Sequence, residues 1–472
     1  MATDSKHGTM PEALVPPPPA YSRDRRARFW FTLLLACGTL VLVYINLTAP
    51  YHTSHISTPE VSISIASSLE TCAWDSLSEH SSLLSVPPIT REEFLTRQDV
   101  LAATLRDAGV DAFIAEPSAS STYYHNISSA FDLSERPFLS ILSSAGQFSY
   151  LVPQFETGRI NPSSQHMVFE GDADAAAIPW PEESNPYGIL SERRSGLKKV
   201  MIDEHARHMI AAGLQNVGIE VVPMSLEVKQ LRAVKTDAEI DIMRGISSFT
   251  RQLVRSLQRC IKVGTPQEDL VAAGHALFAR AGVGEGYWAI ALFGSQAAYP
   301  HGGKRGAILQ EGQFILLDIG SVLHGYGSDV TRTFLPVGGA VSDELMEIWD
   351  TVHESQSAGF AKMFPNETCR DADAASRVPV EKLGYKEFYT HRLGHGLGLE
   401  MHEHPYLNGA NEEKLRAGVV VTNEPGIYVT DEQAKSLGKS EGFGVRLEDP
   451  ILVTEDGGVP LTGRRAVSPW DP

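Results

Sequence analysis

Residues 314–335 read FILLDIGSVLHGYGSDVTRTFL and contain two strand-like apolar runs, at 314–319 and 330–335, on either side of a glycine-containing turn. Asp318 stands near the end of the first run and Asp329 directly before the second. If the runs pair antiparallel about that turn, the two aspartates face each other with Cβ atoms about 5 Å apart. Two like charges so close raise each other's pKa unless a cation lies between them. The pattern therefore predicts a cation site, the alternative being two exposed turn aspartates.

Three histidines recur at four- and seven-residue steps in His391-Arg-Leu-Gly-His395-Gly-Leu-Gly-Leu-Glu-Met-His402. The glycines among them disfavour a helix and allow a close approach of the backbone, so we expect these imidazoles on a strand or loop. A lone histidine is usually a satisfied core or surface residue. Three histidines spaced four and seven residues apart favour a functional site.

Two more carboxylates follow strand-like runs. Asn423-Glu424-Pro-Gly426 comes after an apolar run, and Arg446-Leu-Glu448 places an arginine and a carboxylate on one strand face. Glu448 alone could simply form an ion pair with Arg446. Together with the aspartates and one histidine, however, these residues make a hard, oxygen-rich set that suits two Mn²⁺-like divalent ions. The predicted metal ligands are Asp318, Asp329, His395, Glu424 and Glu448.

The order of these motifs resembles the pita-bread metallopeptidases, and within them the Xaa-Pro aminopeptidase and Xaa-Pro dipeptidase (prolidase) branch. The resemblance covers about residues 90–465, and Leu231 to Ile240 matches the helix that usually opens the catalytic domain. It implies an α+β fold with a pita-bread (creatinase/aminopeptidase-like) catalytic domain. It also implies two divalent metal ions, Mn²⁺ in the first place and Co²⁺ or Zn²⁺ as alternatives.

The same resemblance implies a role for each site residue. Asp318 would bind one ion with both oxygens, while Asp329 and Glu448 would bridge the two ions. Glu424 would also take up and return the proton, and His402 would help to stabilise the oxyanion. The implied catalytic residues are Glu424, His402, His301 and His391, and the implied substrate-binding residues are His301, His391, His402 and Arg446.

The expected activity is hydrolysis of the Xaa-Pro bond at the N-terminus of proline-containing peptides by a metal-bridging hydroxide, which is Xaa-Pro aminopeptidase activity. A prolidase is the main alternative, but no arginine stands near Ala410, where eukaryotic prolidases carry one for the proline carboxylate. Further alternatives are a non-peptidase pita-bread hydrolase such as a creatinase, a methionine aminopeptidase and a non-enzymatic receptor. The intact ligand positions argue against the creatinases and the receptor. For the oligomeric state, a homodimer is one of the assemblies that we consider.

Two globular segments are expected. Residues 89–224 begin with the capping box Thr90-Arg-Glu-Glu93 and alternate helix-like and strand-like runs, which predicts a smaller N-terminal α/β (creatinase-N-like) domain without a catalytic cluster. Residues 225–472 combine a long helical stripe at 242–261 with antiparallel strand-like runs, which predicts the α+β catalytic domain. A second capping box is expected at Thr265-Pro-Gln-Glu268.

Residues 29–47, FWFTLLLACGTLVLVYINL, contain no charge and no proline. As a helix they would be about 28 Å long, close to the thickness of a bilayer's hydrocarbon core. Four arginines precede them in residues 1–28, so the positive-inside rule predicts a cytoplasmic tail and a transmembrane signal anchor. Residues 48–88 would be a Ser/Thr-rich stalk. A buried core helix and a cleaved signal peptide are the alternatives.

The predicted topology is therefore that of a single-pass type II membrane protein with a lumenal or extracellular catalytic domain. Asn126-Ile-Ser128 and Asn366-Glu-Thr368 would then be usable glycosylation acceptors. Among Cys72, Cys260 and Cys369, one pair could form a disulfide, and the sequence does not say which. The net charge of −18 argues against nucleic acid as a partner.

Overall fold

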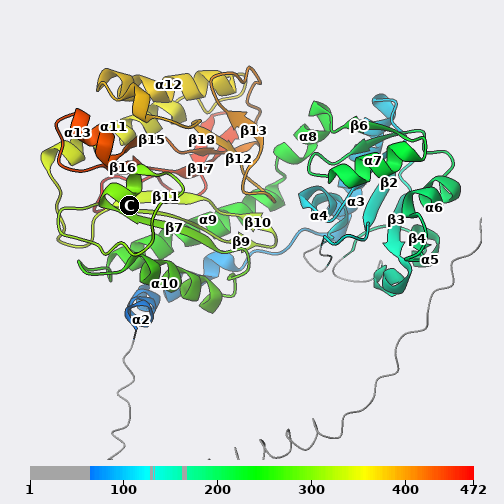
Figure 1. The fold of residues 1–472 in the computed structure, drawn as a ribbon, viewed down its shortest axis with the longest axis horizontal. Helices are drawn as coiled ribbons and strands as arrows, with labels where there is room; N and C mark the ends of the chain where they lie inside the picture. The colour runs from blue at the N-terminus through cyan, green and yellow to red at the C-terminus, as the bar shows by residue number, and fades with distance from the viewer. Residues whose placement is uncertain (1–63, 128–130, 132, 162–166) are drawn as a thin grey trace, which may run out of the picture. The chain divides into compact units, whose positions relative to one another are not determined.

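The computed structural model describes residues 64–127, 131, 133–161 and 167–472, which combine helices and strands in two domains (Figure 1). The predicted tail at 1–28 and membrane span at 29–47 lie outside these residues. Among the residues that are described, no helix is both long and apolar enough to cross a membrane.

The N-terminal α/β domain is built on a six-stranded mixed sheet with the strand order β4-β3-β2-β1-β5-β6. β1 pairs antiparallel with β2 and parallel with β5, and β3 pairs antiparallel with β2 and parallel with β4. The strands are β1 (Ala112–Ala115), β2 (Leu139–Ser143), β3 (Phe148–Pro153), β4 (Ala177–Trp180), β5 (Lys199–Ile202) and β6 (Glu220–Pro223). The helices are α3 (Arg91–Asp107), α4 (Ala119–His125), α5 (Ala173–Ala176), α6 (Pro186–Arg193) and α7 (His208–Asn216), with a 3₁₀ turn at Gln154–Arg159.

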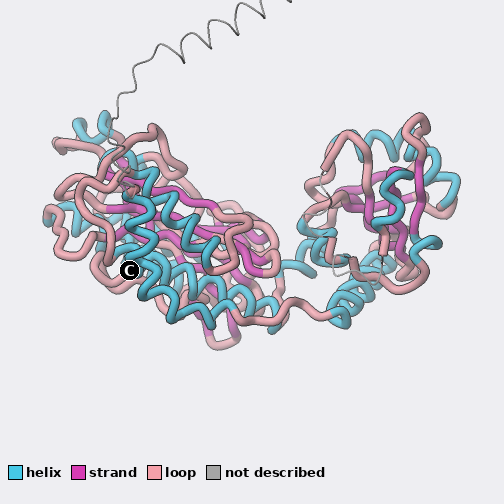
Figure 2. The backbone as a smooth tube through the Cα atoms, turned by 90° about the horizontal axis from the view of Figure 1, so that it is seen from below, coloured by secondary structure: helices cyan, strands magenta, loops and turns pink. Residues whose placement is uncertain are grey.

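The catalytic domain places its strands between two layers of helices, with α9 and α10 on one side and α11 and α12 on the other (Figures 1 and 2). Its helices are α9 (Asp237–Gln258), α10 (Gln267–Arg280), α11 (Asp343–Phe360), α12 (Cys369–Lys382) and α13 (Asp431–Ser436), with 3₁₀ turns at Gly294–Ala298 and Lys386–Phe388. Before them in the chain, α8 (Leu226–Ala233) packs Val228 into the core of the N-terminal domain. Four sheets have the orders β11-β8-β7, β13-β12-β14-β17-β18, β15-β16 and β10-β9.

The strands of these four sheets are β7 (Trp288–Phe293), β8 (Ile315–Gly320), β9 (Val322–Leu323), β10 (Tyr326–Gly327), β11 (Val330–Phe334), β12 (Gly394–Gly396), β13 (Glu403–Leu407), β14 (Val420–Asn423), β15 (Gly426–Val429), β16 (Phe443–Arg446), β17 (Asp449–Thr454) and β18 (Gly457–Pro460). All pairings within these sheets are antiparallel. Most strand residues are buried, as expected for strands covered by helices on both faces.

One predicted helix start needs correction. The helical stripe expected at 242–261 is found on α9, which begins after Thr236 with a capping box that Glu239 completes and ends at Gln258. The box predicted at 265–268 does not form, because Pro266 is the N-cap of α10 and the Thr265 hydroxyl accepts a hydrogen bond from Lys262 N instead. At Thr90, in contrast, the predicted N-cap contact is present, because its hydroxyl accepts a hydrogen bond from Glu93 N.

The register of the two aspartate strands also differs from the prediction. β8 and β11 pair with Asp318 opposite Thr331, so Asp318 and Asp329 are not direct neighbours. The short β9–β10 hairpin between the strands has the same register, with Leu323 opposite Tyr326. The turn is therefore centred one residue later than expected, which shifts the pairing by two residues. Because side chains alternate with a period of two, this shift preserves the face on which each residue lies.

The stalk predicted for 48–88 is wrong over its described part. Residues 64–84 form helix α2 (Ile65–Leu77) and a 3₁₀ turn (Ser78–Leu84). Leu69, Ala73 and Leu77 recur every four residues and pack into the core that α9 and α10 also line. A disulfide joins Cys72 of α2 to Cys260, while Cys369 is free and buried. The serine-rich composition of this segment conceals a short amphipathic helix.

Candidate metal centre and active site

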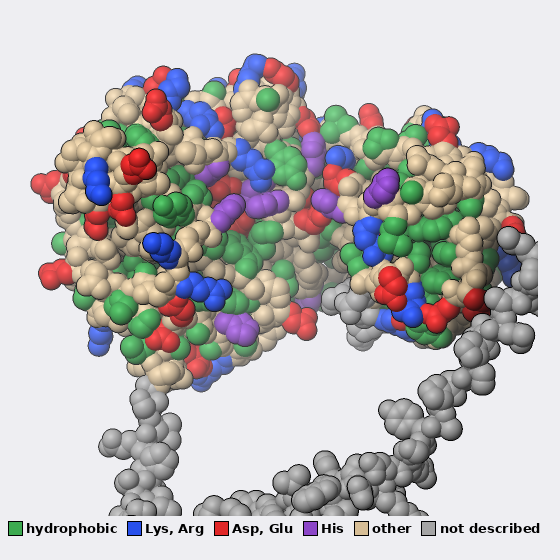
Figure 3. Space-filling view, in the orientation of Figure 1, with side chains coloured by type: hydrophobic (Ala, Val, Ile, Leu, Met, Phe, Trp, Pro, Cys, Tyr) green, Lys and Arg blue, Asp and Glu red, His purple; other side chains and the backbone are tan. Residues whose placement is uncertain are grey.

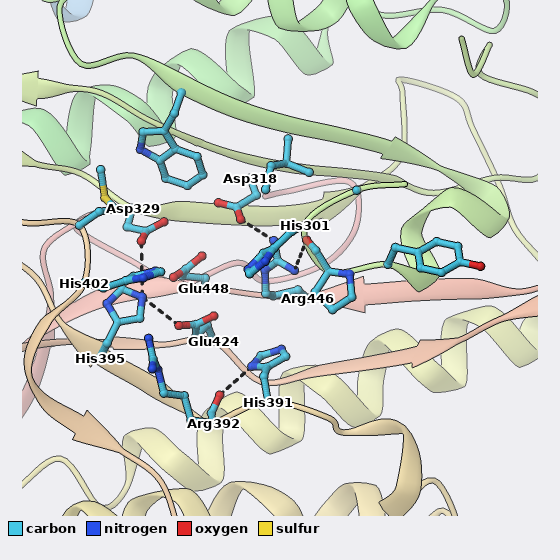
Figure 4. Close-up of a pocket in the computed structure, with 16 residues that line it drawn as sticks. His301, Asp318, Asp329, His391, Arg392, His395, His402, Glu424, Arg446 and Glu448 are labelled. Carbon is cyan, nitrogen blue, oxygen red and sulfur yellow. Dashed lines mark hydrogen bonds and ion pairs between the residues drawn. The ribbon is translucent and has the colours of Figure 1, made fainter. Parts of the chain in front are cut away.

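The five predicted metal ligands meet at strand ends of the catalytic domain (Figure 4). Asp318 lies on β8, Asp329 directly precedes β11, His395 lies on β12, Glu424 connects β14 to β15, and Glu448 connects β16 to β17. All five line one cavity of about 930 Å³. The chain thus supplies the ligands from five segments that are far apart in sequence.

The ligand atoms fall into overlapping groups whose members lie within 4.8 Å of one another. One group contains Asp318, Asp329 and Glu448, and a second contains His395, Glu424 and Glu448. The Nε2 atom of His395 lies 3.1 Å from Oε1 of Glu424 and 3.7 Å from Oδ2 of Asp329. Glu448 belongs to both groups, which is the geometry expected of a ligand shared by two ions.

Burial and mutual repulsion make this site unfavourable without added positive charge. Burial raises the pKa of Asp318, and it raises the pKa values of Asp329 and Glu448 well above normal, with neighbouring carboxylates adding to the rise. Burial would also raise the pKa of Glu424, but the imidazole of His395 beside it outweighs that effect and lowers this pKa to about 2. Without added cations, the raised pKa values mean that Asp318, Asp329 and Glu448 tend to hold protons, which bound metal ions would replace.

The donor set fits two divalent metal ions. Oδ1 of Asp318 is buried and has no hydrogen-bond partner in the described structure, which leaves a lone pair free for a cation. Four carboxylates and one imidazole are the donors that Mn²⁺ and similar ions accept. One ion would be held by Asp318, Asp329 and Glu448, and the second by His395, Glu424 and the shared carboxylates.

Neighbouring groups orient these ligands by hydrogen bonds. Arg446 forms an ion pair with Asp318, and the hydroxyl of Thr331 donates to Glu448 at 2.5 Å. Nδ1 of His395 lies 3.0 Å from the carbonyl oxygen of Gly396, which leaves Nε2 to face the carboxylates. Contacts of this kind fix ligand orientation and charge in metal sites.

Comparisons with known proteins agree with this geometry. Residues 241–455 match the model of metallopeptidase family M24. An uncharacterized peptidase of Schizosaccharomyces pombe is 39% identical over 83% of this chain and 87% of its own length. This chain belongs to metallopeptidase family M24. A putative dipeptidase of Bacillus subtilis is 31% identical over 60% of this chain and 77% of its own. A solved Xaa-Pro dipeptidase from Bacillus anthracis has a TM-score of 0.65 and 25% identity, covering 79% of this chain and 98% of its own.

Membership of family M24 gives the catalytic domain the pita-bread fold, and the family generally binds two divalent metal ions. The three remaining predicted histidines of this M24 chain, His301, His391 and His402, all line the cavity. On the face shown in Figure 3, histidine side chains gather beside acidic and apolar ones on the catalytic domain.

The individual histidines differ in environment. The ring centroid of His402 lies 4.1 Å from that of His395, and its side chain is exposed to the cavity. Burial, then the charges of His395 and Arg392, lowers the pKa of His402 to about 4, so its imidazole is neutral at pH 7. His391 is half-buried, and its Nε2 atom lies 2.8 Å from the hydroxyl of Tyr428. His301 lies on an exposed loop.

Arg446, predicted to bind substrate, is buried, and its guanidinium already has several contacts. Besides the ion pair with Asp318, Nη1 donates to the Tyr428 hydroxyl at 2.9 Å and Nε donates to the Thr331 hydroxyl at 3.0 Å. In the structure this arginine therefore positions Asp318, a predicted metal ligand. Binding of substrate by the same guanidinium stays a prediction.

Sequence reasoning missed several cavity residues. Trp288 and Ile290 come from β7, which was not predicted, although its run Trp288–Phe293 is apolar. Tyr428, which does not line the cavity, was also missed, although its hydroxyl contacts both His391 and Arg446. Arg392 lies inside the histidine motif and was given no role.

All sixteen lining residues come from 288–448, so the described N-terminal domain contributes none.

Proposed function

We propose that this M24 peptidase is a dinuclear metallo-exopeptidase that hydrolyses the Xaa-Pro bond at the N-terminus of peptides and works with Mn²⁺. The observation that carries the proposal is the sharing of Glu448 between two ligand groups in a cavity that also holds His301, His391 and His402. A shared carboxylate supports a two-ion site, and the nearby imidazoles give it hydrogen-bonding groups for a peptide.

In the proposed mechanism, Asp318, Asp329, His395, Glu424 and Glu448 would hold two divalent ions, which would supply Lewis-acid chemistry to an attacking water and the scissile carbonyl. The carboxylate of Glu424, which accepts a hydrogen bond from Thr422 at 3.1 Å, takes the proton of that water and returns it to the leaving nitrogen. The neutral imidazole of His402 donates its N–H to the developing oxyanion. His301 and His391 would contact the proline residue.

A dipeptidase that acts on the same bond is the second candidate. The missing arginine near Ala410 favours longer peptides over free dipeptides. Against this, the putative dipeptidase of Bacillus subtilis and the Xaa-Pro dipeptidase of Bacillus anthracis are similar to this chain. The two candidates share the metal centre and differ only in the group that the substrate carries after its proline.

The test of proline specificity is a comparison of four substrates on the manganese-loaded protein. Ala-Pro and Ala-Pro-Ala should each be cleaved with kcat/KM about 10-fold or more above Ala-Ala and Ala-Ala-Ala, because a pocket shaped for the ring loses contacts with alanine. Protein treated with a chelator is the control and should be inactive. Equal cleavage of the alanine series would contradict the proline requirement. A manganese-loaded protein inactive on all four would point to a non-peptidase hydrolase or a receptor.

We also propose that the protein is a glycoprotein anchored in the membrane by residues 29–47. Its catalytic domain would then be lumenal or extracellular. The Cys72–Cys260 disulfide supports an oxidising compartment, and the arginines before Phe29 support the orientation. In sealed microsomes, protease should leave a fragment of about 45 kDa intact and remove only the short tail. Detergent-opened microsomes are the control. Digestion of the large fragment in sealed microsomes would contradict this topology.

A further inference from the structure

The cavity contains two arginines with different surroundings. Arg446 is buried and bonded to Asp318, Thr331 and Tyr428, so its donors are committed within the protein. Arg392 is half-buried, and no carboxylate of the described residues lies within ion-pair distance of its guanidinium. Among the residues that line the cavity, Arg392 is therefore the cation whose charge is not neutralised by a protein carboxylate.

The side chain of Arg392 is directed into the cavity. In Figure 4 it points toward the same space as His395 and His402. Its guanidinium carbon lies 4.7 Å from the ring centroid of Tyr406, a cation–π contact that favours this conformation. The arginine is thus held in place by an aromatic ring while its hydrogen-bond donors stay available.

The strand register explains how Arg392 relates to the missing arginine near Ala410. β12 pairs antiparallel with β13, placing His395 opposite Tyr406, and Leu393 N donates to Leu407 O at 3.0 Å. Continuing this register brings residue 392 level with the segment just before Ala410. Arg392 therefore belongs to a segment that lies beside the one preceding Ala410, where the sequence lacks an arginine.

We propose that Arg392 binds the free C-terminal carboxylate of a dipeptide substrate, which favours the second candidate function given above, a dipeptidase, over an aminopeptidase for longer chains. The inference rests on the proposed peptidase function. Bound metal ions would offset the charges of the four ligand carboxylates, so a substrate carboxylate in this cavity needs a cation of its own. The planar guanidinium can bind both carboxylate oxygens at once.

The test compares free acids with their amides, Ala-Pro with Ala-Pro-NH₂ and Ala-Ala with Ala-Ala-NH₂. In the wild-type protein, each cleaved acid should have kcat/KM about 10- to 100-fold above its amide, as expected for a charge-assisted bidentate contact. Arg392→Gln should reduce this ratio to about 3-fold or less, and Arg392→Lys should keep part of it. The matched control is Arg416→Gln, which changes an exposed arginine outside the cavity and should leave the ratio unchanged.

Calorimetric titration with L-proline and L-prolinamide gives a second readout that does not depend on turnover. The wild type should bind proline more tightly than prolinamide, and Arg392→Gln should lose the difference. An acid-to-amide ratio that survives in Arg392→Gln, or one near unity in the wild type, would overturn the assignment. Acid preference with equal cleavage of Ala-Pro and Ala-Ala would instead contradict only the proline specificity. If no peptide is cleaved, the proposed function fails and the titration alone decides on Arg392.

Discussion

Replacing Asp329 by Asn should remove bound metal and lower kcat/KM by about 10³-fold or more. Asp329 has ligand atoms close to those of Asp318 and Glu448 on one side and to those of His395 and His402 on the other. The substitution removes one negative charge from a carboxylate that both ion positions use. Metal content by mass spectrometry and hydrolysis of Ala-Pro are the two measurements.

The matched control is Asp456→Asn, which changes an exposed aspartate at a turn and should affect neither quantity. The thermal midpoint of the metal-free Asp329→Asn protein should not fall, because burial among like charges makes the ionised Asp329 unfavourable. An Asp329→Asn protein that retained two ions and full activity would show that the ligand assignment is wrong.

The sequence predicts the described fold well where apolar periodicity is strong. Each strand expected from an apolar run of the catalytic domain, such as residues 314–319, has a counterpart in the structure. β7 was missed because a short apolar run does not by itself distinguish a strand from a buried helix. α2 was missed because only Leu69, Ala73 and Leu77 of its residues are buried, within a segment rich in serine. The disulfide partner of Cys72 could not be chosen from sequence, since pairing depends on the packing of α2 beside the end of α9.

The sequence predicted which residues meet in the candidate site. It predicted the contacts around these residues less well. Asp318 and Asp329 come together although the predicted register was displaced by two residues, because that displacement keeps both on the same faces. The contacts of Arg446 and the availability of Arg392 depend on side-chain conformations that no sequence spacing encodes. Motif order thus predicts which residues meet in the cavity, whereas substrate selection depends on details that only three-dimensional packing reveals.

Replacing His402 by Ala should leave the metal content unchanged and lower kcat by about 10²- to 10³-fold. Its imidazole lies beside that of His395, but a carboxylate-rich ligand set remains complete without it. The lost group is an N–H donor to the oxyanion, an interaction that strengthens in the transition state, so kcat should fall more than KM rises.

His404→Ala is the matched control for His402→Ala, because this residue lies on the same segment but pairs with Glu413 at 2.9 Å and does not line the cavity. It should reduce kcat by less than about 3-fold, the size of a lost partly exposed ion pair. If His402→Ala lost a metal ion, the histidine would be a ligand, as its proximity to Asp329 and His395 also allows. If it kept both ions and normal turnover, oxyanion stabilisation would have to come from the metal ions alone. Metal content and kcat measured on the same two variants therefore separate a ligand from a hydrogen-bond donor at this position.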